Sequence, residues 1–149
     1  MMAIWVWDGF IQADIPNHWS VRDERNLIEC LPPEPVGALQ ISMFQVPGFD
    51  LQAECAAAIA NFIEKQAGRA KTEPRIGERD GCLTVTIEFE SGQADQRLSW
   101  VISAVGCGQM IALATYCYGK DEDVRVKEAA QIIESIRTDT TTKIPDFPH

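Results

Sequence analysis

Cys82-Leu83-Thr84-Val85-Thr86-Ile87-Glu88-Phe89-Glu90 is a run in which apolar and polar residues alternate. A period of two is typical of a β-strand with one buried face. We expect the apolar series to face a core and the polar series to face solvent. The core series is Leu83, Val85, Ile87 and Phe89, and the solvated series is Thr84, Thr86, Glu88 and Glu90.

Further strands are predicted on both sides of this run. Residues 98–105 and 110–118 are apolar on both faces, so we place them in the middle of a sheet that is covered on both sides. Gly106-Cys107-Gly108-Gln109, between them, is typical of a hairpin turn. Residues 69–79 are polar and are predicted at a sheet edge.

The first third of the chain also predicts strands. Residues 3–7 are apolar on both faces, and residues 10–15 alternate. Residues 19–23 and 27–31 flank a charged turn and predict a hairpin. Residues 38–46 then predict a longer strand.

Two helices are predicted from apolar residues at helical spacing. The first spans residues 50–68, with Asp50 as the N-cap and Gly68 in the left-handed position after the last turn. The second spans residues 122–137, with Asp121 or Asp123 as its cap. The stripes predicted to be buried are Leu51, Cys55, Ile59, Phe62 and Ile63 in the first helix, and Val126, Ala129, Ala130, Ile133 and Ile136 in the second.

Together these elements predict one α+β domain over residues 1–137. Its centre is an antiparallel β-sheet of six to eight strands flanked by two long helices. The tail, residues 138–149, holds three consecutive threonines and two prolines. We expect the tail to be extended or disordered.

The composition limits the function. The chain has 149 residues and a formal charge of -9, from 13 basic and 22 acidic side chains. Such an acidic domain repels phosphate backbones, so we expect no direct nucleic-acid binding. Long-range attraction would instead favour a basic protein partner. Acidity that serves only to keep the protein dissolved is the alternative.

The cysteines predict a reducing environment. Five are present, at Cys30, Cys55, Cys82, Cys107 and Cys117, and no pair has C-x-x-C spacing. Because most stand in apolar or alternating segments, we expect all five to be reduced. The start of the chain lacks the pattern of a signal peptide, and no apolar run approaches the length of a membrane span. We therefore predict a cytoplasmic protein that does not enter a membrane.

No motif predicts catalysis, a metal or a cofactor. The histidines are His18 and His149, too few for a metal site with these cysteines. His18 could activate a cysteine, but a turn residue after Pro16-Asn17 is the better interpretation. Gly106-Cys107-Gly108 lacks the third glycine and the helix of a phosphate-binding loop. Glu88 and Glu90 are interpreted as part of a solvated face, not as a catalytic pair.

Trp5 and Trp7 are the candidate partner-binding residues. They share one face of a strand at the start of the chain, where an edge position is expected. Tryptophan is enriched at binding hot spots, and edge strands present unpaired backbone groups. We expect this strand to pair with a second copy, forming a homodimer, or with a strand of a partner. The alternative is that both tryptophans close the core of a monomer.

Four short motifs resemble the Mog1/PsbP-like superfamily, which includes bacterial DcrB-type domains. They are Ile15-Pro16-Asn17-His18-Trp19, Gly37-Ala38-Leu39-Gln40-Ile41-Ser42, Leu113-Ala114-Thr115-Tyr116 and Ile132-Ile133-Glu134-Ser135-Ile136. The resemblance implies an α/β/α sandwich and a bacterial, mostly non-enzymatic protein. Members do unrelated jobs, including small-GTPase binding, photosystem assembly and neutralising secreted toxins. No functional residue is carried over, because no functional motif matches.

We therefore predict a non-catalytic protein-binding module, such as an immunity-type or accessory protein. The alternative is a carrier of a small ligand or lipid that uses a groove between the sheet and a helix. Fold alone does not decide between them.

Overall fold

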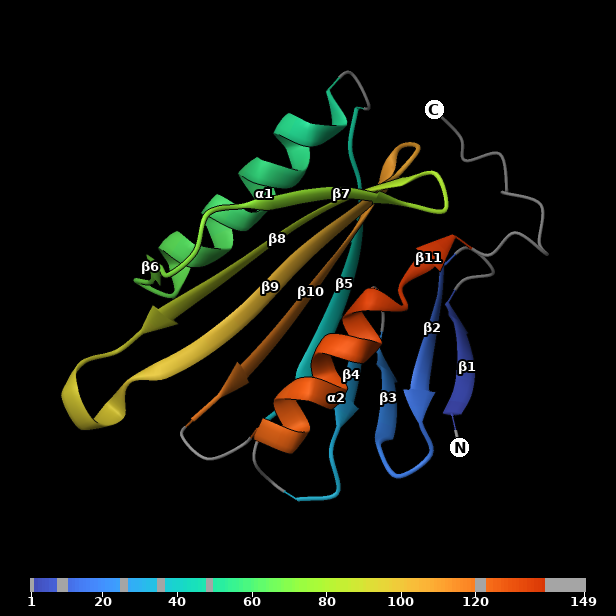
Figure 1. Cartoon of the computed structure of the whole chain (residues 1–149). Helices are drawn as coiled ribbons and strands as arrows, with labels where there is room; N and C mark the ends of the chain where they lie inside the picture. Colours follow the sequence, from blue (N-terminus) through green and yellow to red (C-terminus); the bar gives the residue numbers. More distant parts are fainter. Residues whose placement is uncertain are drawn as a thin grey trace.

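The computed structural model describes residues 2–7, 11–24, 27–34, 37–47, 50–119 and 123–138. Within these ranges the chain forms two β-sheets and two α-helices (Figure 1). The helices are α1 (Leu51–Lys65) and α2 (Asp123–Glu134). The smaller sheet has the order β1 (Met2–Trp7), β2 (Ile11–Pro16) and β11 (Arg137–Thr138).

The larger sheet has eight antiparallel strands, which confirms the predicted α+β class with a central antiparallel sheet. Its order is β3-β4-β5-β10-β9-β8-β6, and β7 pairs with β8 beside β6. The bounds are β3 (Ser20–Glu24), β4 (Leu27–Leu31), β5 (Leu39–Gln45), β6 (Arg69–Ala70), β7 (Arg75–Arg79), β8 (Cys82–Ser91), β9 (Leu98–Cys107) and β10 (Met110–Tyr118). The strands before β3 therefore form a sheet of their own, and not part of the central one.

The centre of the larger sheet is the β9–β10 hairpin. A two-residue turn, Gly108-Gln109, joins the strands, with Cys107 opposite Met110. Gly108 has a φ of 63°, a conformation that glycine adopts without a steric penalty. Residues 101–107 of β9 are all buried. The predicted turn and the predicted two-sided burial of these strands are both confirmed.

Helix α1 covers one face of the larger sheet. Asp50 caps it as predicted, accepting a hydrogen bond from the Ala53 backbone N–H at 3.1 Å. Cys55 and Ile59 are its buried residues, and they pack against β8, β9 and β10. The predicted stripe therefore faces the sheet.

The end of α1 differs from the prediction. Ala67, and not Gly68, has the left-handed conformation, with a φ of 52°. The Gly68 N–H bonds the Ile63 carbonyl at 2.9 Å and the Ala67 N–H bonds that of Glu64 at 3.0 Å, the two bonds of a Schellman cap. Gly68 is needed for space instead, because a Cβ there would stand 2.6 Å from the Phe89 ring.

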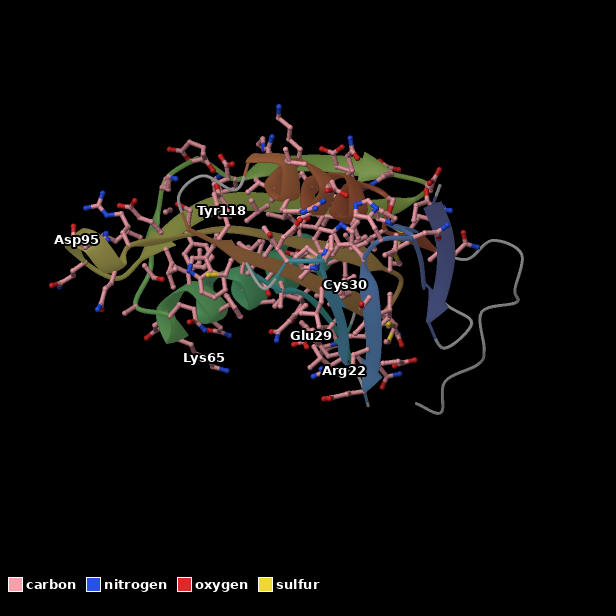
Figure 2. The ribbon with its side chains drawn as sticks, turned by 90° about the horizontal axis from the view of Figure 1, so that it is seen from below. Arg22, Glu29, Cys30, Lys65, Asp95 and Tyr118 are labelled. Atoms are coloured by element: carbon pink, nitrogen blue, oxygen red, sulfur yellow. A yellow bond between two sulfur atoms is a disulfide. The ribbon has the colours of Figure 1, made fainter. Side chains whose placement is uncertain are left out.

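Helix α2 covers the opposite face (Figure 2). Ala129, Ile133 and Ile136 of the predicted stripe are buried, and Ile132 is buried as well. They pack in a cluster that includes residues of β2, β4, β5 and β10. Both helices are shorter than predicted, and the cap predicted at Asp121 lies outside the described residues, as does the tail beyond Thr138.

The smaller sheet is attached to the end of α2. The Ser135 hydroxyl accepts a hydrogen bond from the Asp14 backbone N–H at 2.8 Å, and the Arg137 guanidinium bonds the Asp14 carboxylate at 3.2 Å. β11 then pairs with β2, with Arg137 opposite Gln12. Segments more than 120 residues apart are thereby joined, which links the start of the chain to its second helix.

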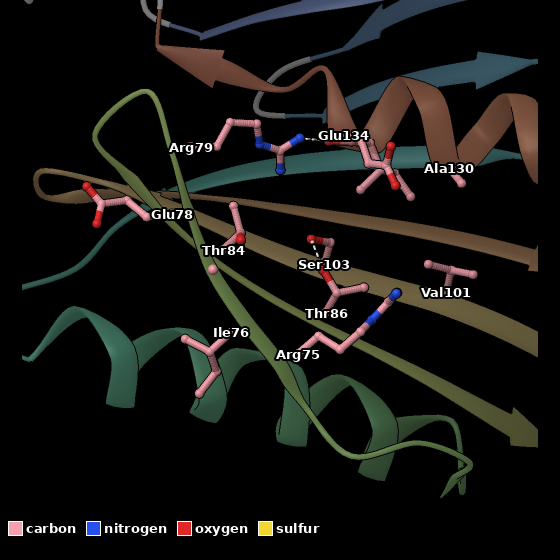
Figure 3. Close-up of a pocket in the computed structure, with 12 residues that line it drawn as sticks. Arg75, Ile76, Glu78, Arg79, Thr84, Thr86, Val101, Ser103, Ala130 and Glu134 are labelled. Carbon is pink, nitrogen blue, oxygen red and sulfur yellow. Dashed lines mark hydrogen bonds between the residues drawn. The ribbon is translucent and has the colours of Figure 1, made fainter.

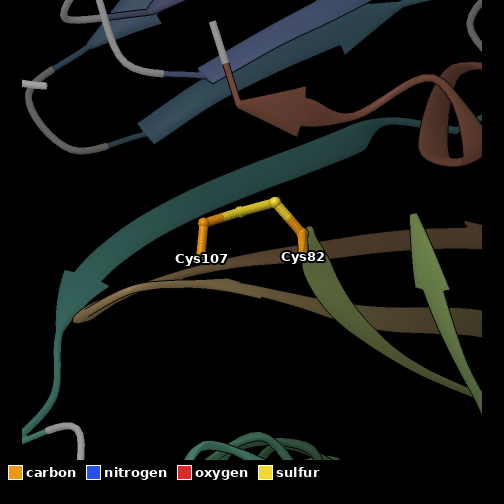
Figure 4. Close-up of a disulfide and its surroundings, with 2 residues drawn as sticks. All are labelled: Cys82 and Cys107. Carbon is orange, nitrogen blue, oxygen red and sulfur yellow. A yellow bond between two sulfur atoms is a disulfide. The ribbon is translucent and has the colours of Figure 1, made fainter. Parts of the chain in front are cut away.

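The prediction that all five cysteines are reduced is wrong. Cys82 and Cys107 form a disulfide between β8 and β9, with their Cα atoms 4.7 Å apart (Figure 4). The pairing follows from strand register, because Leu83 stands opposite Gly106. Cys30, Cys55 and Cys117 lie outside the disulfide. Burial raises the pKa of the Cys30 thiol to about 12 and that of the Cys55 thiol to about 11, so both stay protonated at neutral pH.

Neither described helix is both long and apolar enough to cross a membrane.

Candidate functional site

A groove lies between β7 and the C-terminal half of α2, above β8 and β9 (Figure 3). It is open to solvent and has a volume of about 510 Å³. It arises from an offset between the helices. α1 contacts β8, β9 and β10, whereas α2 contacts β10 and the smaller sheet. α2 therefore leaves part of the β8–β9 face uncovered, and the groove occupies that part.

The floor of the groove comes from the polar series of β8. Thr84 and Thr86 were expected to face solvent, but both are half-buried and line the groove. Thr86 stands opposite Ser103 of β9, and their hydroxyl oxygens are 2.9 Å apart in a hydrogen bond. Ser103 is fully buried. The alternation of β8 was predicted correctly, but its polar face is partly covered and is not simply solvated.

One wall of the groove is β7, which the sequence analysis placed correctly at an edge. Among the described strands β7 pairs with β8 alone, and four of its five residues are exposed. Arg75, Gly77 and Arg79 stand opposite Thr86, Thr84 and Cys82, so they share the face that borders the groove. Ile76 and Glu78 also border the groove, but Figure 3 shows their side chains on the opposite side of β7 from Thr84 and Thr86.

The two arginines of this wall differ in their surroundings. Arg79 donates a hydrogen bond to the Ile133 carbonyl at 3.4 Å and lies near Glu134. Burial lowers the pKa of Arg79, and the nearby Glu134 and Asp80 carboxylates oppose that shift. A guanidinium remains charged at neutral pH all the same. Arg75 makes no ion pair with any residue that the structure describes.

Gly77 leaves the wall open between the two arginines. It has no side chain, and a Cβ built there would be 3.1 Å from the Thr84 hydroxyl oxygen. Its backbone does not have a positive φ, so conformational freedom does not explain the glycine. The consequence of the glycine is space above Thr84.

The opposite wall is α2, which supplies Ala130, Ile133 and Glu134. With Val101 of the floor, these give the groove an apolar side facing the basic wall of β7. The groove thus offers guanidinium donors, hydroxyls and a small apolar surface. In the described residues no three metal-ligand side chains gather, and no histidine lines the groove. This arrangement is suited to binding a ligand.

The candidate residues Trp5 and Trp7 lie elsewhere, in β1. Among the described strands β1 pairs only with β2, so it has the edge position that was predicted. Trp5 stands opposite Ala13, and Trp7 opposite Ile11. The side chains of both tryptophans are outside the described part of the structure. Their role in binding a partner or closing the core remains a prediction.

His18 takes part in a polar cluster that the sequence analysis missed. It lies in a turn, as predicted, and its Nε2 atom bonds the Glu128 carboxylate of α2. Trp19 Nε1 donates to the same carboxylate at 3.1 Å. Arg125 bonds Glu128 and also reaches both carboxylate oxygens of Glu34 at 2.6 Å. The cluster joins three segments far apart in the sequence, so no local motif could have revealed it.

This polar cluster shifts the pKa values of its acids. Burial raises the pKa of Glu128, but hydrogen bonds from Trp19, Arg125 and His18 outweigh burial and lower it overall. The hydrogen bond from Arg125 lowers the pKa of Glu34. Both carboxylates are therefore ionised at neutral pH. The cluster holds the β2–β3 turn against α2, which is a structural role.

Comparison with known proteins gives matches only among solved structures, because no family model and no curated protein matches the chain. Cyanobacterial PsbP (CyanoP) from Synechocystis sp. PCC 6803 has a TM-score of 0.70 at 10% identity, over 92% of each chain. PA94 from Pseudomonas aeruginosa, a protein of unknown function and putative regulator, has a TM-score of 0.57 at 14% identity, over 99% of each.

A third structure comes from Bacteroides thetaiotaomicron VPI-5482, with a TM-score of 0.63 at 14% identity. The match covers 95% of this chain but 50% of that one, so this chain spans half the length of the Bacteroides protein. At such identities the likeness shows the fold alone. The protein has a PsbP-like α+β fold. The predicted resemblance to the Mog1/PsbP-like superfamily is confirmed at that level.

Proposed function

We propose that the protein is a non-catalytic binding module that holds a partner protein at the groove between β7 and α2. The observation that carries this proposal is the exposed edge strand β7, which borders an open groove of about 510 Å³. Edge strands can accept a strand of another chain through backbone hydrogen bonds. An immunity-type or accessory role, which the superfamily resemblance implies, is part of this proposal. The finer description of the fold, an α/β/α sandwich with two flanking helices, also belongs to this proposal.

A carrier of a small ligand is the second candidate, because the groove lies between the sheet and a helix, as that prediction requires. Its arginines and hydroxyls favour a polar ligand over a lipid. Native mass spectrometry of the purified protein separates the two candidates. A co-purified small molecule that is lost on substitution of Arg75 and Thr86 supports the carrier.

The compartment needs a revised proposal. The cytoplasmic prediction depended on five reduced thiols together with the lack of a signal-peptide pattern, and the Cys82–Cys107 disulfide removes the first of these premises. Structural disulfides persist in oxidising compartments. We therefore propose that the protein acts in an oxidising compartment, where the Cys82–Cys107 disulfide persists. Rapid alkylation in cells, followed by peptide mass spectrometry, tests this proposal. Alkylated Cys82 and Cys107 would show that both thiols are free in cells and that the protein is in a reducing compartment.

The edge strand β1 supports a second contact surface, with Trp5 or Trp7 in a homodimer or partner interface. Deleting residues 1–7 tests it when mass by light scattering and thermal stability are measured together. A smaller assembly that stays folded supports an interface. A monomer before and after the deletion, with lower stability, assigns both tryptophans to the core.

A photo-crosslinking amino acid at Ile76 tests the main proposal. Ile76 is 54% exposed on β7, and Leu98, which is 41% exposed on β9, is a matched control. We expect a crosslinked partner protein from position 76 and none from position 98. The predicted attraction of a basic partner, which would act through the net charge of -9 of the whole chain, is checked by the isoelectric point of the crosslinked protein. Crosslinking from Leu98 alone would show that the partner binds elsewhere and would contradict a site at the groove.

A further inference from the structure

β7 has a pattern of side chains that specifies what can pair with it. Arg75, Gly77 and Arg79 alternate with Ile76 and Glu78. On the groove face this gives two positive charges with a gap between them: Arg75 makes no ion pair among the described residues, and Arg79 bonds the Ile133 carbonyl and lies near Glu134. At the rise of a strand, the Cα atoms of Arg75 and Arg79 are about 13 Å apart. A strand added beside β7 would have the same rise, so its residues four apart would stand opposite both arginines.

The arginines disfavour one occupant of this edge, a second copy of the chain. Antiparallel pairing of two β7 strands centred on Gly77 would place Arg75 of each copy against Arg79 of the other. Like charges directly opposite each other in a sheet are destabilising, whereas opposite charges contribute favourably. The same two side chains therefore select an acidic strand.

Gly77 adds a requirement for size. A side chain opposite Gly77 meets no Cβ, so a large apolar side chain there can pack over the glycine. A large residue opposite a glycine compensates for the missing packing there.

We infer that β7 receives an extended segment of a partner polypeptide that has two acidic residues four positions apart and a large apolar residue midway. The inference rests on the proposed function and names the chemistry of its ligand. The acidic residues stand opposite Arg75 and Arg79, and the apolar residue stands opposite Gly77. Because this pattern reads the same in both directions, it fits parallel and antiparallel pairing alike.

The experiment is an NMR titration of the isotopically labelled protein with a blocked seven-residue peptide. The peptide has Glu at its second and sixth positions, Leu at its centre, and Thr elsewhere. We expect amide shifts along β7 and β8, including residues 75–79, Thr84 and Thr86. A peptide with Lys in place of both Glu should bind about tenfold more weakly. No shifts, or equal shifts with both peptides, would overturn the inference.

Charge reversal locates the contact. Arg75→Glu with Arg79→Glu should weaken the Glu peptide about tenfold and should strengthen the Lys peptide. The control is Arg22→Glu with Arg97→Glu, which changes the net charge equally at two exposed arginines of other strands or turns. A similar loss in the control would show a general charge effect and would refute pairing at β7.

Two further outcomes separate this inference from the proposed function. Glutarate alone is the probe for a small acid. If it shifts the same amides with equal affinity, the groove takes a small ligand and the peptide inference fails. If a partner crosslinks at Ile76 but the Glu peptide does not bind, the docking site stands and the acidic pattern is wrong.

Discussion

The two faces of the larger sheet are closed in different ways. Under α1, Phe89 and Trp100 stack with ring centroids 5.3 Å apart, and Phe62 packs edge-on against both. Under the C-terminal half of α2, the same strands present Thr84, Thr86 and Ser103 beside an open groove. One β-strand, β8, supplies both faces through its alternation. Both faces therefore bury a core cluster, but α1 covers β8 and β9 with aromatic packing, whereas α2 leaves part of the same strands open to the groove.

The largest effect should come from the aromatic packing of the α1 face. Phe89 is fully buried, so Phe89→Ala should lower the free energy of unfolding by about 3–5 kcal/mol through lost burial and a residual cavity. Chemical denaturation measures it. Glu64→Ala, on the exposed side of α1, is the control and should cost at most about 0.5 kcal/mol. Equal costs would mean that α1 does not close this face.

The disulfide should give the next largest effect, because it ties β8 to β9 at one end of the α2 face. Cys82 and Cys107 are 25 residues apart, and replacing both by Ala should cost about 3 kcal/mol by removing the constraint on the unfolded chain. Denaturation without reductant should expose three titratable thiols, and five after reduction. Five thiols before reduction would contradict the bond.

The sequence predicted the face of β8 under α1 better than the face that borders the groove. The alternation of β8 correctly assigned Val85 and Phe89 to a core, because period two directly determines which residues share a face. It could not show which part of the other face α2 would leave uncovered, since that depends on how far the helix lies from β8. The Cys82–Cys107 bond was missed for a related reason: it depends on the register of two strands, which spacing along the chain does not reveal.

The polar cluster and the edge strands show the same difference between features that local sequence reveals and features that depend on distant residues. His18 was recognised as a turn residue from Pro16-Asn17 before it, which is local information. Its bond to Glu128 joins residues 110 positions apart and could not be read from either segment. The edge position of β1 was predicted correctly from its place at the start of the chain. The edge position of β7 was also predicted correctly, from its polar sequence, but the groove that it borders was not predicted.

The polar cluster should make stability depend on pH through Glu128. Its pKa in the folded protein is lower than the ordinary value of 4.5, so the stabilisation is complete above about pH 4.5 and is lost as pH falls through the folded pKa. Glu128→Gln should cost about 1–2 kcal/mol at pH 7, because the charged hydrogen bonds from Trp19 and Arg125 are weakened.

Thermal melts of the wild type and Glu128→Gln between pH 7 and pH 3 measure this dependence. The gap between the two melting temperatures should narrow as pH falls. The charged and titratable neighbours of Glu128 are His18 and Arg125, with Glu34 beyond Arg125. A gap that stays constant to pH 3 would show that the Glu128 charge contributes nothing to folding.

The smallest effect on stability should come from Gly77→Val, and it is the sharpest test of the contrast between the faces. Valine suits an exposed strand, and Gly77 needs no positive φ. Its Cβ would be 3.1 Å from the Thr84 hydroxyl oxygen, so Thr84 must shift by a few tenths of an ångström. These effects oppose each other, and the free energy of unfolding should change by less than about 0.5 kcal/mol in chemical denaturation.

Crosslinking from Ile76 should nevertheless fall in the Gly77→Val variant, because the valine fills the space above Thr84. If Gly77→Val instead loses as much stability as Phe89→Ala, and crosslinking is unchanged, then this face belongs to the core and is not a partner-binding surface.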